Sequence, residues 1–390
     1  MRNDLRIGVA GYGLRRSLAL EAHRPGNGSR VVALCDPDPA ARERARAEIG
    51  PDLQDTSDFG ELLTDDVDAV MILTPDHTHV ELAVAALKAG KTTLVEKPLA
   101  VTVEDCDLIL RTARDHGTRL YVGHNMRHMP VVRTMRQLIM DGAIGEVKAV
   151  WCRHFVGHGG DYYFKDWHAD RRNTTGLLLQ KGAHDIDVIH WLAGARTTRV
   201  TGMGGLTVYG QVTDRSEGLP TDWFSPATNW PPLAQHGLNP VVDVEDLSMV
   251  HMRLENGVHA SYEQCHYTPD YWRNYTVIGT AGRLENFGDH GEHAVVRVWN
   301  SGRRDYDPVG DLQVPVTAGT GGHGGADEGL ISEFVRFAVE GGPTDTSPVA
   351  ARDSIAAGVY ATESLRDGST PREVPPVSPD LAAYFAAGQI

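Results

Sequence analysis

The segment Lys181–Leu192 reads KGAHDIDVIHWL and carries two side chains that can handle protons. His184 and Asp187 stand three residues apart, so on a helix both lie on one face and can point toward the same ligand. A neutral imidazole can accept a proton from a hydroxyl group. Gln180, four residues before His184, can hydrogen-bond to a hydroxyl group but cannot take its proton. By itself, such a histidine is more often a core residue than a catalytic one.

A lysine stands at the end of a strand expected over residues 92–96, in the sequence Glu96-Lys97-Pro98. The carboxyl ends of the strands in a doubly wound sheet line the ligand crevice. A lysine there can approach both a bound cofactor and its substrate, where it can take part in proton transfer.

A glycine pair, Gly11 and Gly13, follows the strand expected over residues 5–10. The first glycine permits a tight turn, and the second lets the backbone approach a pyrophosphate at a helix N-terminus. Asp36, at the end of the second strand, can hydrogen-bond the adenosine ribose and oppose a 2′-phosphate. The pattern predicts NAD rather than NADP. Arg16 occupies the third glycine place, so the first helix must sit differently or the arginine must point away.

The segment Asp161–Arg172 (DYYFKDWHADRR) is dense in aromatic and hydrogen-bonding side chains. A carbohydrate ring, apolar on its C–H face and polar at its rim, suits aromatic faces with polar neighbours. We consider Trp167, His168 and Arg171 as pocket residues, although core packing or a surface role is equally open for each.

Two histidine pairs and four cysteines raise the question of a metal. The pair 77/79 lies at a strand-to-helix junction that the cofactor crevice explains, and the pair 154/158 lacks the helical HExxH context. Cys35, Cys106, Cys152 and Cys265 include no CxxC spacing. We therefore expect buried reduced thiols and no metal.

The first third of the chain alternates apolar strands, expected over 5–10, 30–35, 67–74, 92–96 and 120–123, with helices over about 78–89 and 102–117. Strands separated by helices of this length predict right-handed βαβ units and a parallel sheet. The sequence therefore predicts an α/β fold with a doubly wound Rossmann sheet over residues 1–124, the NAD-binding domain.

The rest of the chain has a different pattern. Helices are expected over 130–142, 177–192, 328–339 and 349–365, a strand over 146–156, and hairpins around Asn256-Gly257 and Ala281-Gly282. Residues 206–240 are rich in glycine, proline and polar residues and are expected to form a long excursion. Residues 125–390 thus read as an α+β domain with an open, mainly antiparallel sheet, for substrate binding and oligomerisation.

The bulk composition narrows the partners. The net charge of −15 disfavours nucleic acid and anionic membranes as partners, and 41% hydrophobic residues indicate a globular protein. No apolar run approaches the roughly 20 residues of a membrane span, and the N-terminus lacks a secretory signal. The expected location is the cytoplasm.

Six motifs occur in a distinctive order: TPDHTH at 74–79, EKP at 96–98, GHNMR at 123–127, GAIGEV at 142–147, KGAHDIDVIHWL at 181–192 and IGTAGRLE at 278–285. In this order and spacing the chain closely resembles the glucose–fructose oxidoreductase/inositol dehydrogenase/MocA family over nearly its whole length. The resemblance implies a Rossmann domain followed by a domain whose open sheet often forms a subunit interface. It therefore implies a homo-oligomer, either a dimer or a tetramer.

The resemblance also implies roles for individual residues. Lys97 and His184 fall on the family's catalytic positions, and Pro98 on a cis-proline. Many sugar dehydrogenases of the family have aspartate where this chain has Gln180, so the usual lysine–aspartate–histidine set is incomplete. The implied cofactor-binding residues are Gly11, Gly13, Leu14, Arg15, Asp36, Thr74, Pro75, His79, Glu96, Lys97 and Asn125. The implied substrate-binding residues are Lys97, Arg127, Trp167, His168, Arg171, Gln180, His184 and Asp187.

The expected function is NAD-dependent transfer of hydride between nicotinamide and a hydroxyl of a sugar, glycoside or cyclitol. Two alternatives stay open. One is an NAD-dependent glycosidase that acts by transient oxidation at C3 and elimination. The other is a non-catalytic protein that binds NAD or a sugar.

Overall fold

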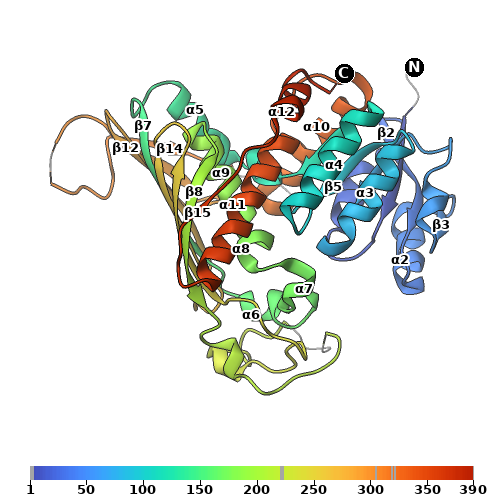
Figure 1. Cartoon of the computed structure of the whole chain (residues 1–390), viewed down its shortest axis with the longest axis horizontal. Helices are drawn as coiled ribbons and strands as arrows, with labels where there is room; N and C mark the ends of the chain where they lie inside the picture. Colours follow the sequence, from blue (N-terminus) through green and yellow to red (C-terminus); the bar gives the residue numbers. More distant parts are fainter. Residues whose placement is uncertain (1–3, 220–223, 304, 318, 320–321, 390) are drawn as a thin grey trace. The chain divides into compact units, whose positions relative to one another are not determined.

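A computed structural model describes residues 4–219, 224–303, 305–317, 319 and 322–389. It divides into two compact units. The first comprises Met1–Met129, Thr320–Arg352 and Val377–Ile390, and the second Pro130–Gly319 and Asp353–Pro376. Figure 1 follows the chain through both units.

The first unit is built on a six-stranded sheet in the order β3-β2-β1-β4-β5-β6, with every pair parallel. This confirms the predicted doubly wound sheet. Strands β1 and β4 are almost entirely buried, as parallel strands covered on both faces must be. The strands are β1 (Leu5–Ala10), β2 (Ser29–Cys35), β3 (Gln54–Thr56), β4 (Ala69–Ile72), β5 (Thr92–Glu96) and β6 (Leu120–Gly123).

Helix α4 of this unit begins and ends where local signals predict. The Thr102 hydroxyl accepts a hydrogen bond from the Asp105 N–H at 3.1 Å, and Gly117 ends the same helix with φ +59°. Helices α3 and α4 pack side by side (Figure 1). The helices are α1 (Arg16–Ala22), α2 (Pro39–Ile49), α3 (His79–Lys88), α4 (Val103–His116), α10 (Ala326–Glu340) and α12 (Pro379–Ala386).

The division of the chain differs from the expected boundary at residue 124, because α10 and α12 belong to the first unit. The reason is hydrophobic burial. Leu330, Ile331, Phe334 and Phe337 of α10 are 0–1% exposed and share one apolar cluster with residues of β1 and β2. The Rossmann core is therefore completed by a segment about 200 residues further along the chain.

The second unit contains a nine-stranded sheet in the order β14-β13-β12-β11-β7-β10-β9-β8-β15. Among the strand pairs that the structure describes here, only β7 and β10 are parallel, so the predicted mainly antiparallel sheet is confirmed. Gly257, with φ +84°, turns the expected hairpin. The strands are β7 (Val147–Phe155), β8 (Thr197–Gly205), β9 (Leu247–Leu254), β10 (His259–Cys265), β11 (Trp272–Gly279), β12 (Arg283–Phe287), β13 (Val295–Trp299), β14 (Leu312–Pro315) and β15 (Arg372–Glu373).

One expected helix of the second unit, over 177–192, is interrupted at Lys181 and forms two helices. Glycine has a low helix propensity, and a Cβ at Gly182 would lie 2.9 Å from the Tyr262 ring. Gln180 and His184 therefore do not share one continuous helix. The helices are α5 (Pro130–Met140), α6 (Gly159–Tyr163), α7 (Arg171–Thr174), α8 (Leu177–Gln180) and α9 (Gly182–Ala193), while α11 (Pro348–Arg366) contains the boundary between the units.

A buried ionic cluster joins α9 to this sheet. Asp185, with no exposed surface, lies 3.1 Å from Arg273 Nε and 3.2 Å from His154 Nδ1, and it accepts hydrogen bonds from the hydroxyls of Tyr262 and Tyr275. These partners come from three neighbouring strands, β10, β7 and β11. Although burial opposes its charge, Arg273 and His154 hold the pKa of Asp185 well below its usual range.

The opposite face of the sheet carries exposed apolar side chains. Trp151, Met203 and Met249 are 52%, 51% and 40% exposed, whereas Val150 and Cys152, on the other face of β7, are buried. Such a face suits association with another subunit. The homo-oligomer itself stays a prediction.

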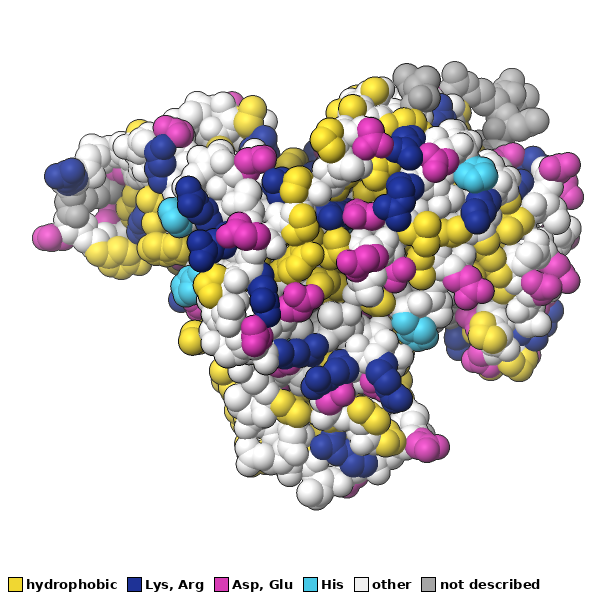
Figure 2. Space-filling model, viewed as in Figure 1, with side chains coloured by type: hydrophobic (Ala, Val, Ile, Leu, Met, Phe, Trp, Pro, Cys, Tyr) yellow, Lys and Arg dark blue, Asp and Glu magenta, His cyan; other side chains and the backbone are white. Residues whose placement is uncertain are grey.

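The surface shown in Figure 2 has acidic and basic side chains intermixed. Among the described residues, no helix is long and apolar enough to cross a membrane.

Replacing Phe334 with alanine should lower the free energy of unfolding by about 3–5 kcal/mol, because it leaves a cavity in the first unit's core. Val339 lies on the same helix and is 45% exposed, so Val339→Ala should change stability little. Urea denaturation compares the two variants. Equal losses would mean that α10 does not complete the core.

Stability should also fall as the pH decreases from about 6.5 toward 3. Burial, followed by Arg273, lowers the pKa of His154 to about 3. The unfolded chain therefore binds a proton in this window that the folded chain does not, a contribution of up to about 1.4 kcal/mol per pH unit. His154→Gln should flatten the pH dependence of the urea midpoint, whereas His259→Gln, at an exposed position, should not. Identical slopes in all three proteins would contradict this assignment.

Candidate functional site

The loop between β1 and α1 has the geometry of a phosphate-binding turn. Gly11 has φ +88°, and a Cβ there would lie 2.9 Å from the Leu73 carbonyl oxygen, so only glycine fits. A Cβ at Gly13 would have no atom within 4 Å, which leaves the backbone open to a ligand. Leu14, the next residue of this loop, is 64% exposed.

Asp36 lies beside this loop, at the end of β2. One carboxylate oxygen accepts a hydrogen bond from the Tyr12 N–H at 2.8 Å and the other from the Asp38 N–H at 2.9 Å. Each carboxylate oxygen can accept more than one hydrogen bond, so both remain able to bind ribose hydroxyls.

Arg16, at the place of the missing third glycine, points away from the sheet. Its side chain is 44% exposed and lies 3.6 Å from the Glu48 carboxylate of α2, which also accepts a 2.8 Å hydrogen bond from the Tyr12 hydroxyl. The sequence left open whether the first helix is displaced or the Arg16 side chain points away. In the structure, the Arg16 side chain points away.

Arg15 is held by two carboxylates. Its Nε donates to Glu96 at 2.6 Å, and its two terminal nitrogens donate to the two oxygens of Asp327 at 3.1 Å each. Although burial opposes the charge, Glu96 and Asp327 raise the pKa of Arg15. Glu96 also accepts a hydrogen bond from the Lys97 N–H. The interactions of Arg15 and Glu96 thus tie the glycine loop to the strand end that carries Lys97.

The Lys97–Pro98 peptide bond is cis, as the resemblance implied. The buried ring of His79 links this segment to the end of β4, with Nδ1 2.7 Å from the Pro98 carbonyl oxygen and Nε2 2.9 Å from that of Thr74. Burial lowers the pKa of His79, against the effect of these two carbonyls. The ring therefore positions the Lys97 segment, and direct contacts of Thr74, Pro75 and His79 with the cofactor stay predictions.

Beyond β6, Asn125 is 1% exposed and its Nδ2 donates to Asp327 at 2.7 Å. Within the described chain its Oδ1 is buried and has no hydrogen-bond partner. Arg127 is also buried and donates to the Asp345 carbonyl oxygen at 2.6 Å. That contact is structural, and its predicted contact with substrate stays a prediction.

The residues of the first unit fit NAD. The open backbone at Gly13 suits the pyrophosphate, Asp36 suits the adenosine ribose, and the unpaired Oδ1 of Asn125 offers an acceptor near the strand ends. Asp327 is a residue that sequence reasoning missed. Its only signal is an acidic residue in the first turn of a helix.

In the second unit, Gln180, His184 and Asp187 are all buried, at 4%, 5% and 2% exposure. They lie on α8 and α9, the helices beside the Asp185 cluster. Asp185 lies within the motif at 181–192, but sequence reasoning singled out its neighbours His184 and Asp187 instead.

Two of the three predicted pocket residues of the second unit join a ring cluster. The rings of Trp167 and His168 stack with their centroids 3.7 Å apart. The centroid of the Tyr163 ring lies 5.3 Å from that of His168 and 5.2 Å from that of His266. Lys181 places its ammonium 5.9 Å from the Tyr163 ring centre. The third predicted residue, Arg171, lies elsewhere and pairs with Asp243 at 3.0 Å.

Two buried residues at the end of β10 have side-chain atoms without a hydrogen-bond partner. Gln264 lies in the strand and His266 follows it directly. Both ring nitrogens of His266 and the Nε2 of Gln264 have no hydrogen-bond partner among the residues that the structure describes. His266 is 0% and Gln264 1% exposed, and burial lowers the pKa of His266 well below its usual value. Unpaired buried polar atoms of this kind suggest a polar ligand. Sequence reasoning missed both, because neither belongs to a motif.

Within the described ranges, no group of three or more histidine, cysteine, aspartate or glutamate residues could hold a metal ion. The four cysteines are free thiols, and Cys35, Cys106 and Cys152 are buried.

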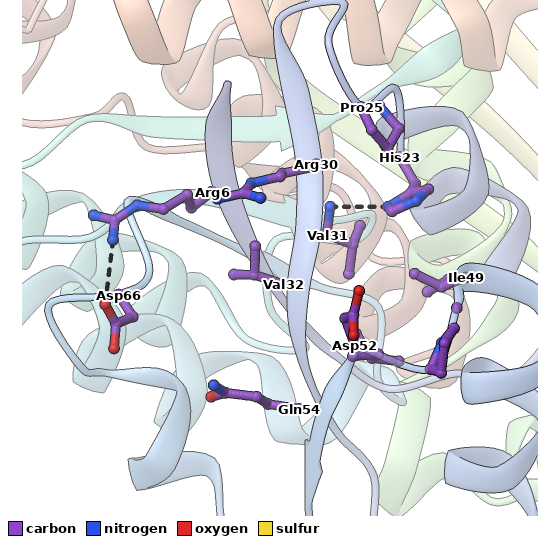
Figure 3. A pocket seen from close by; sticks show the side chains of 13 residues that line it. Arg6, His23, Pro25, Arg30, Val31, Val32, Ile49, Asp52, Gln54 and Asp66 are labelled. Atoms are coloured by element: carbon purple, nitrogen blue, oxygen red, sulfur yellow. Dashed lines mark hydrogen bonds and ion pairs between the residues drawn. The ribbon is translucent and has the colours of Figure 1, made fainter. Parts of the chain in front are cut away.

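A pocket of about 570 Å³ lies at the other end of the Rossmann strands (Figure 3). It is lined by residues near the amino ends of β1, β2 and β3, including Arg6, Arg30 and Gln54, and Arg6 is paired there with Asp66 at 3.4 Å. None of the predicted site residues lines it, so we assign it no part in the chemistry.

Two curated relatives are each 32% identical to this chain over about half of its length. Inositol 2-dehydrogenase 1 of Saccharopolyspora erythraea is 32% identical over 200 residues, which cover 50% of this chain and 57% of that protein. The 2,7-anhydro-N-acetylneuraminate hydratase of Mediterraneibacter gnavus is 32% identical over 181 residues, 46% of each chain. The chain thus spans about half the length of these relatives.

Among solved structures, levoglucosan dehydrogenase in complex with NADH and levoglucosan superposes with a TM-score of 0.77 at 21% identity, covering 96% of this chain and 100% of that one. This likeness shows the shared fold.

Two family models cover most of the chain. The oxidoreductase model with an NAD-binding Rossmann fold matches residues 5–124, and the C-terminal domain model of the same family matches residues 132–285. The first match agrees with the parallel sheet and glycine loop, and the second with the large mixed sheet. The chain is an NAD-binding oxidoreductase-family protein and belongs to the glucose–fructose oxidoreductase/inositol dehydrogenase/MocA family.

Proposed function

We propose that the chain is an NAD-dependent dehydrogenase, or reductase in reverse, that acts on a hydroxyl of a sugar, glycoside or cyclitol. The observation that carries this proposal is the pair of buried ring nitrogens of His266 that have no hydrogen-bond partner among the described residues. The His266 ring contacts that of Tyr163, which in turn contacts His168, and His168 stacks on Trp167. Aromatic faces with spare donors and acceptors suit a hydroxyl-rich ring. The inositol dehydrogenase relative supports the same substrate class.

The residues divide the chemistry between them. NAD, when bound, supplies the hydride acceptor. We assign acceptance of the hydroxyl proton, as the C–H bond breaks, to the neutral imidazole of His184, and general acid–base assistance to Lys97. Gln180 hydrogen-bonds a substrate hydroxyl without taking its proton.

A second candidate, which Gln180 leaves open, is an NAD-dependent glycosidase. In that reaction, oxidation at C3 acidifies the C2 proton, and elimination breaks the glycosidic bond. Water then adds to the resulting double bond, and reduction of the C3 ketone restores the hydroxyl. The net reaction is hydrolysis, with NAD regenerated. A relative that is named as a hydratase of an anhydro sugar indicates that related sequences carry out water addition or loss on a sugar.

Incubation with a panel of sugars, glycosides and cyclitols in the presence of NAD tests the proposal. The absorbance of NADH and the identity of the products are followed together. A dehydrogenase accumulates NADH with an oxidised product, and a glycosidase releases sugar without net NADH. Tight binding of ligand with neither outcome would contradict both and favour a non-catalytic binding protein.

Replacement of Lys97 by alanine should reduce turnover by about a hundredfold or more, the loss expected for a positioned acid–base group. The dissociation constant for NAD should change much less. Lys88→Ala, at an exposed position of α3, is the matched control and should leave turnover intact. Near-normal turnover of Lys97→Ala would remove this lysine from the mechanism.

Asp36 should make the chain prefer NAD, because its carboxylate opposes a 2′-phosphate. Calorimetric titration with NAD and NADP should show tighter binding of NAD. Asp36→Ser should reduce the ratio of the NADP and NAD dissociation constants by about tenfold. Asp38, two residues away, caps α2, and Asp38→Ser keeps a capping hydroxyl and should preserve the ratio. Equal or tighter binding of NADP by the unchanged protein would contradict the role of Asp36 in NAD preference.

A further inference from the structure

The described part of the excursion over residues 206–240 has an apolar core of its own. Phe164, which follows α6 directly, and Tyr209 are 0% and 3% exposed, and the centroids of their rings lie 4.6 Å apart. Val212 and Leu238 belong to the same buried cluster. Burial of these side chains against Phe164 therefore holds the excursion beside α6 (Figure 1).

Buried polar groups fix the same contact. Asp161 of α6 is 2% exposed and accepts a hydrogen bond from Asn229 Nδ2 at 2.7 Å. It also lies 3.0 Å from the ammonium group of Lys165, which is 0% exposed. An ion pair without water is stable only when its geometry and hydrogen bonds are satisfied. The Asp161 carboxylate therefore fixes Asn229, and with it the neighbouring part of the excursion, against α6.

Outside these anchors, α6 and the excursion expose large aromatic side chains. Tyr162, Phe224 and Trp230 are 42%, 41% and 46% exposed. The centroid of the Phe224 ring lies 5.6 Å from that of Tyr162 and 5.0 Å from that of His158, which is also exposed. Trp230 directly follows Asn229, the residue that is bonded to α6. We call His158, Tyr162, Phe224 and Trp230 the outer aromatic patch.

The outer aromatic patch adjoins the ring cluster that contains His266. Tyr162 and Tyr163 are successive residues of α6, so their side chains leave the helix about 100° apart. Tyr163 is partly buried and its ring contacts that of His266, whereas the Tyr162 ring contacts that of Phe224. A ligand ring bound against Tyr163 therefore has its substituents within reach of the patch.

The size of the patch favours a small ligand over a protein. Three aromatic side chains exposed to this degree offer on the order of 300 Å² of apolar surface, whereas a stable protein interface buries roughly 800 Å² on each partner. Aromatic faces suit the C–H face of a sugar ring. Because the excursion is already fixed to α6, little conformational entropy is lost when such a ring binds.

We propose that the substrate is a disaccharide, whose second ring stacks on the outer aromatic patch while the first occupies the site beside Tyr163 and His266. This inference rests on the proposed function, because the first ring is the one that the chain oxidises. It narrows the substrate class from sugars, glycosides and cyclitols in general to a glycoside of two sugar rings. The patch touches no reacting group, so it contributes to affinity and not to the chemical step.

Calorimetric titration of the full chain, saturated with NADH so that no hydroxyl is oxidised, tests the proposal. The single-ring probes are both methyl glycosides of glucose, galactose, mannose and xylose, together with myo-inositol. The two-ring probes are maltose, cellobiose, lactose, mannobiose and xylobiose, which carry the same sugars at their non-reducing ends. For the first ring that the chain prefers, the disaccharide should bind about tenfold or more tightly than the methyl glycoside.

Three variants locate the effect. Phe224→Ala removes an exposed ring of the patch and should reduce the ratio of the two dissociation constants about tenfold. Tyr162→Ala should reduce the ratio in the same direction. Tyr306→Ala is the matched control, because Tyr306 is 74% exposed in the segment between β13 and β14 of the same unit, and it should keep the ratio of the unchanged protein.

The proposal is overturned if a methyl glycoside or myo-inositol binds as tightly as every disaccharide. It is also overturned if Phe224→Ala and Tyr162→Ala both keep the full ratio, since the second ring then binds elsewhere. A lower sedimentation coefficient of Phe224→Ala with an unchanged ratio would assign the patch to a second copy of the chain. Tight binding of single-ring probes without a gain from the second ring contradicts this inference alone, whereas binding of no probe contradicts the proposed function as well.

Discussion

The buried pairing of Asp185 with Arg273 is the interaction on which the second unit depends most. A carboxylate and a guanidinium without water are stable only when their charges and hydrogen-bonding atoms are satisfied, and removal of one partner typically costs about 3–5 kcal/mol. Here Arg273, His154 and two tyrosine hydroxyls surround Asp185. The pair anchors α9 on three strands at once. Because His184 precedes Asp185 directly, the same interaction sets the position of the proposed base.

The first unit uses the same physical device with different residues. Arg15 joins Glu96 of β5 and Asp327 of α10, and Glu96 in turn accepts a hydrogen bond from the Lys97 backbone. The glycine loop, the strand end that carries Lys97 and a distant helix are thus connected by one side chain. A charge network that is fully paired restricts its members to one geometry, which preorganises the residues at the strand ends.

The two departures from the family pattern have different consequences. Arg16 in place of glycine is accommodated by turning outward to Glu48, so the loop keeps its shape. Gln180 in place of aspartate is buried, and its effect is chemical. A carboxylate can exchange a proton with a neighbouring group, whereas an amide cannot, so the proposed proton transfer falls to His184 with Lys97. The fold accommodates both changes, and under the proposed function only the second changes the groups that can transfer a proton.

The sequence by itself determined what depends on neighbouring residues. Apolar runs predicted the parallel strands, Thr102 and Gly117 the ends of α4, and Asn256-Gly257 the hairpin, because periodicity, capping and turn conformation are local properties. The motif order predicted the family. The tertiary structure alone decided that α10 completes the Rossmann core, that α9 begins only after a break at Lys181, and that Asp185, His266 and Asp327 matter. These features arise from partners up to 312 residues apart, and no local pattern encodes which distant side chain will meet which.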